Sequence, residues 1–475
     1  MLFNSLQFAF FFIIIVTLYF SIPHRYRWML LLAGSYFFYM CWNWKYIILI
    51  MISTFIDYFS GLRMAALKQR SQRLKYLLLS LFTNLGLLFT FKYFNFFSDS
   101  LNSGLELLGL SVHIPYIHVL LPVGISFYTF QTLSYSIDVY RGKIKAERHL
   151  GIFALYVSFF PQLVAGPIER ASRLLPQFYR RNEFDEARVV SGLRLMLWGL
   201  FKKIVVANRV ALYVDAVYNN AELHSGLTLL FATYLFAFQI YCDFSGYSDI
   251  AIGAARVLGY DLMKNFNRPY FAKTITEFWS RWHISLSTWF RDYVYIPLGG
   301  NRKGELRMFI NLFIVFLVSG MWHGANWTFL VWGALHGFYA AMSKLTLPLR
   351  DRIVAQLRLP KIVVDSVRMF VAFQLVCLGW VYFRAASIEQ AHYIITQIFS
   401  FDWSGLFITA LDQLVYGLVS ILLLLAVDVS QEWFGAGKSF SMRPRSIRWA
   451  SYVILIVVMV LIGVFDESQF IYFQF

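Results

Sequence analysis

Charged residues are scarce in this sequence. Asp, Glu, Lys and Arg make up only 14% of the 475 residues, whereas a soluble globular protein carries about a quarter. The 36 residues from Met308 to Ser343 contain none of the four. Such a run is long enough to enter a bilayer twice, because one crossing takes about 20 residues. The shortage of charge therefore argues against a water-soluble protein.

Cysteines are also few. Cys41, Cys242 and Cys377 are the only three, and all lie in apolar segments without the paired spacing of a metal site. We expect neither a disulfide nor a zinc or other metal site. The sequence is rich instead in apolar residues, at 59%, and in aromatic residues, at 19%. This composition predicts an all-α, polytopic helical membrane protein.

The net charge is +16, from 42 basic and 26 acidic residues. The basic residues fall mainly in alternate short connections, which is the positive-inside pattern of a membrane protein, so we expect no nucleic-acid partner. The pattern puts the N-terminus outside. About twelve crossings return the C-terminus, with Asp466 and Glu467, to the outside as well. The predicted spans are 7–22, 28–41, 46–61, 76–95, 116–135, 190–216, 226–256, 308–322, 326–343, 363–383, 411–429 and 447–465.

Two segments do not fit the regular alternation of membrane spans and short connections. Residues 150–187 carry Phe160-Pro161 and Gly166-Pro167 between basic residues, which favours a re-entrant or interfacial element. Residues 278–293 have aromatic side chains at helical spacing, which alone favours one interfacial amphipathic helix with His283 as an ordinary interfacial histidine. No internal repeat or linker is visible, so residues 1–475 are predicted to form a single membrane domain.

Polar residues inside the apolar spans are the first pointers to a site. His323 interrupts the charge-free run between Trp322 and Gly324, and imidazole can remain neutral there and still exchange a proton near pH 7. Asp243 and Asp249 lie within another apolar span, on different faces of a helix because six residues turn about 240° net. Each has a structural alternative. His323 could simply be hydrogen-bonded at a helix end, and the two aspartates could belong to a buried structural hydrogen-bond network.

Seven short segments follow one another along nearly the whole chain. They are 121–131 (LPVGISFYTFQ), 160–168 (FPQLVAGPI), 243–249 (DFSGYSD), 281–287 (RWHISLS), 295–301 (YIPLGGN), 321–324 (MWHG) and 380–384 (WVYFR). Any one of them alone is weak. Together and in this order they resemble the membrane-bound O-acyltransferase family, in particular its bacterial branch of alginate and peptidoglycan O-acetylation.

The resemblance implies an O-acyltransferase whose helical membrane core surrounds a central tunnel. The family's near-invariant histidine corresponds to His323 and its second polar position to His283, so both are expected to be catalytic. His323 would act as a base or carry the acyl group, and His283 would polarise the donor carbonyl or orient His323. The residues expected along the substrate path are Gln239, Tyr241, Asp243, Ser245, Tyr247, Asp249, Trp282, Ser285, Trp322 and Asn326.

The resemblance also implies a donor and partners. No permanently bound cofactor is expected. Acetyl-CoA is the expected cytosolic donor, and its phosphates would meet the basic stretch 260–307, with Arg281 and Arg291 as the expected contacts. A solvated positive-inside loop is the competing explanation of those charges.

The acceptor side follows from the same resemblance. The acetyl group would cross a bacterial inner membrane to an exported or cell-wall polysaccharide. An extracytoplasmic serine-type acetyltransferase would complete the reaction. Membrane lipid surrounds such a chain, and both termini are expected in the periplasm.

Two other functions stay open. The same fold could transfer D-alanyl or another acyl group, for example onto teichoic acids. A glycan or lipid transporter would also place polar residues in broken helices along a substrate path, although the absence of a visible inverted repeat counts against it.

Overall fold

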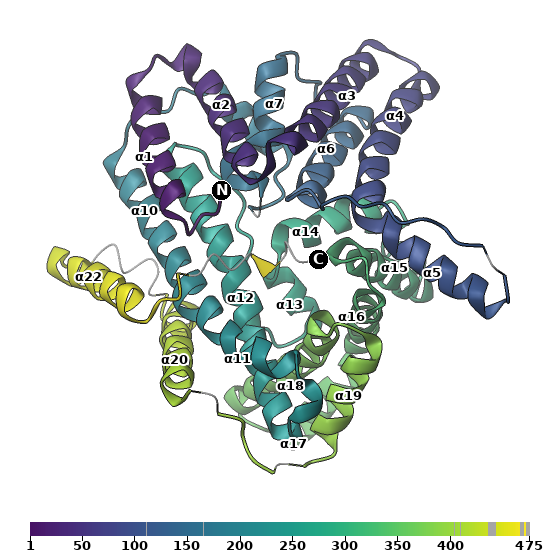
Figure 1. The fold of residues 1–475 in the computed structure, drawn as a ribbon, viewed down its shortest axis with the longest axis vertical. Coiled ribbons are helices and arrows are strands. Elements are labelled where there is room, and N and C mark those ends of the chain that lie inside the picture. The colour runs from purple at the N-terminus through teal and green to yellow at the C-terminus, as the bar shows by residue number, and fades with distance from the viewer. Residues whose placement is uncertain are drawn as a thin grey trace. The chain divides into compact units, whose positions relative to one another are not determined.

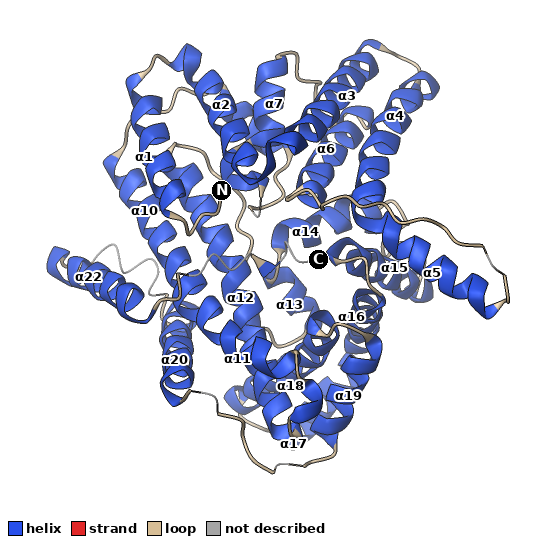
Figure 2. Cartoon of the chain, in the orientation of Figure 1, coloured by secondary structure: helices blue, strands red, loops and turns tan. Residues whose placement is uncertain are grey.

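The computed structural model describes residues 1–110, 112–164, 166–402, 404–408, 410–435, 443–465 and 470–471. Every regular element in this part of the chain is a helix (Figures 1 and 2), which confirms the predicted all-α class. Ala165 of the second motif, and Asp466, Glu467 and Phe475 of the topology prediction, lie outside the described residues.

Seven helical stretches in the described part are long and apolar enough to cross a membrane. They are His24–Ala66, Arg70–Leu107, Gly226–Val257, Glu305–His323, Lys361–Arg384, Leu411–Trp433 and Arg445–Ile462. The protein is therefore a multi-pass helical membrane protein, as predicted. Each of the twelve predicted spans overlaps a helix, but the number that cross the bilayer stays a prediction.

The chain divides into two compact units, and the first contains residues 1–196 and 250–263. Its helices pack around a buried carboxylate, Asp57, which accepts hydrogen bonds from Ser80, Ser136 and the side-chain amide of Asn84. The helices are α1 (Leu6–Ser21), α2 (His24–Asn43), η1 (Trp44–Tyr46), α3 (Ile47–Ala66), α4 (Arg70–Leu88), η2 (Phe89–Tyr93), α5 (Phe94–Leu107), α6 (Ile125–Tyr140), α7 (Leu150–Ser158), α8 (Phe160–Leu163), α9 (Ala171–Phe178) and most of α10 (Glu186–Leu200).

The predicted span 116–135 begins too early. Helix α6 starts only at Ile125, because Gly124 before it adopts a left-handed φ of 77° that favours glycine. A Cβ at Gly124 would also lie 2.7 Å from the carbonyl oxygen of Leu163. Hydropathy cannot register this break, since the residues before it are as apolar as the helix.

The segment 150–187 contains only short helices. The longest, α7, has nine residues and so a length of roughly 13 Å, less than half of a hydrocarbon core of about 30 Å. The length of these helices supports the prediction of a re-entrant or interfacial element rather than a full crossing.

The second unit contains residues 197–249 and 264–475, as far as they are described. The division into two units does not test the predicted single domain, which stays a prediction. The helices are η3 (Phe201–Ala207), α11 (Asn208–Tyr218), η4 (Ala221–Leu223), α12 (Gly226–Val257, whose end from Ile250 belongs to the first unit), η5 (Pro269–Phe271), α13 (Ile275–Arg281), α14 (Ile284–Phe290), η6 (Arg291–Tyr295), α15 (Glu305–His323), α16 (Trp327–Leu345), α17 (Leu347–Leu357), α18 (Lys361–Arg384), α19 (Ile388–Phe399), α20 (Leu411–Trp433) and α22 (Arg445–Ile462).

The prediction of one amphipathic helix over 278–293 is wrong. The segment forms two short helices, α13 and α14, separated at Trp282 and His283. His283 has a left-handed φ of 42° and is completely buried, so it is not an interfacial histidine. The break turns both aromatic and imidazole side chains into the interior, which a continuous helix with one apolar face would not do.

Candidate active site

The helical hairpin α15–α16 positions His323 as the last residue of α15. The two helices pack closely because glycines face the opposite backbone: a Cβ at Gly320 would lie 2.2 Å from the carbonyl oxygen of Phe329, and a Cβ at Gly333 would lie 2.4 Å from that of Phe316. The turn is closed by Asn326, whose side chain accepts the N–H of Thr328 at 3.0 Å and so caps α16.

Aromatic rings enclose the imidazole of His323, which is only 3% exposed. The ring centroids of Trp322, Trp332 and Phe383 lie 5.0, 4.9 and 5.3 Å from that of His323. Phe383 comes from α18, so three helices contribute to this enclosure. It keeps water away from a group that can take up or release a proton near pH 7.

His283 lies in the break between α13 and α14, and Asn265 fixes its position. The backbone carbonyl of Asn265 accepts the N–H of Ile284 at 2.9 Å, and its side-chain oxygen accepts the hydroxyl of Ser285 at 2.9 Å. Burial lowers the pKa of His283 to about 3. The imidazole is therefore neutral at physiological pH.

Trp322 is the common neighbour of the two histidines. Its ring centroid lies 5.7 Å from that of His283 and 5.0 Å from that of His323. The ring centroid of Phe244 lies 4.6 Å from that of His283. The structure thus brings together three residues that the sequence predicted as site residues, His283 from the break before α14 and Trp322 and His323 from α15.

The carboxylates of α12 form ion pairs with two consecutive lysines of η3; the Lys203–Asp243 pair is buried, and Asp249 of the other pair is partly exposed. Lys203 Nζ lies 2.6 Å from Asp243 Oδ1, and Lys202 Nζ lies 2.7 Å from Asp249 Oδ2. The substrate-path role of Asp243 and Asp249 stays a prediction.

The other predicted residues of α12 extend this polar cluster. Ser245 accepts a hydrogen bond from Lys202 at 2.9 Å, and Tyr241 donates to Asp428 at 3.1 Å. The side-chain amide oxygen of Gln239 is buried and has no hydrogen-bond donor among the described residues. The ring of Tyr247 packs against Phe470 at 4.6 Å.

Near the chain's end, Phe470 and Ile471 contact α12. Both are buried, and the backbone N–H of Ile471 donates to Asp243 Oδ2 at 2.8 Å. Asp243 therefore holds two segments at once, η3 through Lys203 and the end of the chain through Ile471.

Trp282 and Arg281 are adjacent in the sequence, but Trp282 lies among aromatic rings and Arg281 between carboxylates. Trp282 is fully buried, and its ring centroid lies 5.0 Å from that of Trp380, which in turn stacks on Trp332 at 6.2 Å. Arg281 forms ion pairs with Glu277 and Glu432 at 2.7 and 2.8 Å. Its expected contact with donor phosphates stays a prediction.

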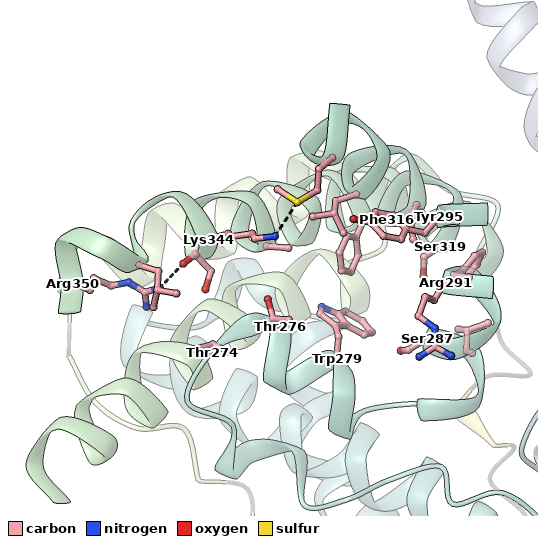
Figure 3. Close-up of a pocket in the computed structure, with 18 residues that line it drawn as sticks. Thr274, Thr276, Trp279, Ser287, Arg291, Tyr295, Phe316, Ser319, Lys344 and Arg350 are labelled. Atoms are coloured by element: carbon pink, nitrogen blue, oxygen red, sulfur yellow. Dashed lines mark hydrogen bonds between the residues drawn. The ribbon is translucent and has the colours of Figure 1, made fainter. Parts of the chain in front are cut away.

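A cavity of about 530 Å³ lies among α13, α14, α15 and α16 (Figure 3). Trp279 and Phe316 lie in the middle of the labelled residues, Lys344 and Arg350 at one end, and Arg291 and Ser319 towards the other. Ser319 precedes His323 by one helical turn on α15. Arg291 is thus found at a cavity, although it also pairs with Asp292 at 2.9 Å.

Several residues of this region were missed in the sequence. His336 on α16 is fully buried and accepts the indole N–H of Trp279 on Nδ1 at 3.3 Å, so its Nε2 carries the proton. Lys344 and Arg350, which line the cavity, were not among the predicted site residues. The pairing of Lys202 and Lys203 with Asp249 and Asp243 could have been predicted from the sequence, because two cations and two carboxylates in apolar segments balance in number.

Comparison with known proteins gives the family. The model of the membrane-bound O-acyltransferase family matches residues 31–383. The chain belongs to the membrane-bound O-acyltransferase family. It is therefore a membrane O-acyltransferase, as the sequence motifs predicted. The matched range includes both histidines, the cavity and the aromatic residues around them.

Individual relatives refine the comparison. The chain is 42% identical over 409 residues to the probable alginate O-acetylase AlgI of Azotobacter vinelandii, covering 85% of this chain and 79% of the relative. It is 36% identical over 387 residues to the peptidoglycan O-acetyltransferase of Helicobacter pylori, covering 76% and 71%. It is 29% identical over 232 residues to the teichoic acid D-alanyltransferase of Streptococcus thermophilus, covering 45% and 55%. The branch predicted from the motifs is thus confirmed.

Proposed function

We propose that this O-acyltransferase takes acetyl groups from cytosolic acetyl-CoA and passes them across a bacterial inner membrane for O-acetylation of an exported or cell-wall polysaccharide. The observation that carries the proposal is the cavity with Lys344 and Arg350 at one end and Ser319, one turn before His323, towards the other. Arg291 also lies towards the Ser319 end, but it is paired with Asp292. A donor with phosphates at one end and a small acyl thioester at the other matches this polarity.

The cationic end suits the phosphates of coenzyme A. The only hydrogen bond of the Lys344 amino group within the described residues goes to the sulfur of Met308, at 2.9 Å, and a thioether is a weak acceptor. Arg350 has no carboxylate partner in that part of the chain. Lys344 is therefore available to phosphate oxygens of the donor, and Arg350 adds positive charge beside it, whereas Arg281 is already held by two carboxylates.

His323, one helical turn beyond Ser319 and outside the cavity lining, then supplies the chemistry. As a nucleophile, an imidazole nitrogen forms a bond to the thioester carbonyl carbon, the carbon–sulfur bond breaks, and the thiolate leaves. As a base, it takes the proton of the acceptor hydroxyl while that oxygen attacks. The aromatic enclosure protects the activated acyl group from hydrolysis in either case. Neutral His283 donates a hydrogen bond or orients the site rather than supplying positive charge.

The position of His323 favours delivery to the outer side. It lies fifteen residues past Met308, or roughly 22 Å along α15 at about 1.5 Å per residue. A predicted in-to-out span beginning at Met308 places it in the middle-to-outer part of the bilayer. The names of the relatives point to alginate or peptidoglycan as the class of acceptor, and an extracytoplasmic serine-type acetyltransferase would complete the transfer.

Transfer of D-alanyl or another acyl group by the same fold is the second proposal. The teichoic acid D-alanyltransferase covers only 45% of the chain, against 85% for the alginate relative. That difference in coverage favours acetyl transfer.

Inverted membrane vesicles test the donor and its side. Acetyl-CoA labelled in the acetyl group, added outside such vesicles, presents the donor to the cytosolic face. We expect label to appear in polymer inside the vesicles. Lys344→Gln should raise the KM for acetyl-CoA about fivefold or more, since one charge-assisted contact to phosphate is lost. Lys361→Gln, another basic residue but outside the cavity lining, is the matched control. Label transfer from donor supplied only on the periplasmic side would contradict the proposal.

A further inference from the structure

A second cavity, of about 540 Å³, lies between the C-terminal half of α16, α17 and the first half of α18. These three helices are neighbours in the second unit (Figure 1). Most of the residues that line it are aliphatic or aromatic, among them Phe338, Met342, Val354, Leu357, Val367 and Val371. The walls therefore suit a hydrocarbon chain.

The charges on this cavity are all positive. Lys273, Arg350 and Arg368 line it, and no acidic residue does. Lys273 is paired with Asp365 and Arg368 with Asp351, each at 2.8 Å. Arg350 donates from Nη2 only to the carbonyl of Ser343, and its buried Nε has no acceptor within the described residues. One uncompensated guanidinium thus lies beside an apolar cavity.

The surface around the cavity exposes apolar side chains. Leu347, Leu349 and Leu357 of α17 are 42%, 57% and 59% exposed, and Val367 and Val371 of α18 are 55% and 49% exposed. Arg352, Arg358 and Lys361 lie in the same stretch of sequence. An amphipathic helix with exposed leucines and basic residues lies at the headgroup boundary of a bilayer, and the basic residues place it at the cytosolic leaflet.

We propose that this cavity binds one anionic phospholipid of the cytosolic leaflet. An acyl chain fills the space between α16, α17 and α18, and the phosphate accepts hydrogen bonds from Arg350. Arg350 also lines the neighbouring cavity around Trp279, so the lipid forms part of the wall at that cavity's cationic end. The proposal rests on this cavity alone and holds whether or not acetyl-CoA is the donor.

Phospholipid retention tests the site. Wild-type protein in mild detergent is delipidated, exposed to dioleoyl-phosphatidylglycerol or dioleoyl-phosphatidylcholine, and examined by native mass spectrometry. We expect one phosphatidylglycerol to remain bound, at about five- to tenfold higher affinity than phosphatidylcholine. Val354→Trp and Leu357→Trp both fill the cavity and should abolish this retention. Arg350→Gln should lower the affinity for phosphatidylglycerol by a similar factor and leave that for phosphatidylcholine nearly unchanged.

Matched controls come from the same helices. Val363→Trp changes an exposed valine of α18 that does not line the cavity, and Arg352→Gln removes an arginine of α17 that does not line it. Both should retain phosphatidylglycerol like the wild type. Retention by both tryptophan variants, equal binding of the two lipids, or displacement of the lipid by coenzyme A would each overturn the proposal. Coenzyme A displacing it would assign the cavity to the acyl donor instead.

Discussion

At the scale of single residues, His323 is the group on which acyl transfer should depend. His323→Ala leaves the α15–α16 hairpin with its glycine contacts, so we expect normal amounts of protein in the membrane and no acetylation of exported polymer. His323→Asn should fail as well, because an amide can hydrogen-bond but can neither take up a proton near neutral pH nor carry an acyl group. The measurement is the acetyl content of the polymer, with membrane abundance determined alongside.

His283→Ala provides the comparison for that experiment. We assign it to orientation or polarisation, so the variant should retain more activity than His323→Ala. Near-normal acetylation by His323→Ala would make that histidine structural and would strengthen the transporter alternative.

Glu169 gives a pH-dependent prediction of stability. It is completely buried, its carboxylate accepts the N–H of Met263, and burial raises its pKa to about 7. The folded state therefore holds this proton more tightly than the unfolded state. Stability should fall as pH rises from about 4.5 to 7, by about 3 kcal/mol in total, and level off above. Glu169→Gln cannot titrate, so its melting temperature should vary less between pH 5 and 8 than that of the wild type. Identical pH profiles would show that Glu169 is ionised throughout.

At the scale of elements, the contact between η3 and α12 depends on a buried ion pair. Lys203→Met removes the cation and leaves Asp243 buried with only the N–H of Ile471 among its described partners. We expect a loss of about 3–5 kcal/mol of stability. Lys203→Met combined with Asp243→Leu replaces both charges and should restore most of the loss. Thermal unfolding of the two variants measures the difference. A double variant as unstable as the single one would mean that the pair is needed for more than charge balance.

The same elements show how much of the structure could be predicted from the sequence alone. Hydropathy located the long helices because each contains a long apolar stretch, and the MWHG motif drew attention to His323. The start of α6 and the break before α14 were not predicted, because both depend on left-handed backbone conformations at Gly124 and His283 rather than on polarity. The contacts of Trp332 and Phe383 with His323 were not predicted, because they result from packing between α16 and α18 and correspond to no spacing in the sequence.

At the scale of the whole molecule, the distribution of basic residues predicts the orientation in the membrane. Arg63, Lys68, Arg70, Arg73 and Lys75 form one connection, and residues 96–115 contain no Lys or Arg. Positive residues in short connections stay in the cytosol. Reporter tags at Met1 and Phe475 should therefore both signal from outside the inner membrane, and a tag inserted near Arg70 should signal from the cytosol.

The tag at Phe475 is the decisive one, because it counts the crossings. An even number, such as the twelve predicted, returns the chain to the side on which it began. Residues 150–187 contribute no crossing to that number, in keeping with the nine residues of α7. A cytosolic signal from Phe475 together with an outside signal from Met1 would require an odd number. The segment to be reassigned would then be 150–187, or one of α1 and α6, whose 16 residues each are short for a full crossing of about 30 Å. His323 would still end α15, but whether it lies towards the periplasm or the cytosol would have to be decided again, and with it the direction of acetyl transfer.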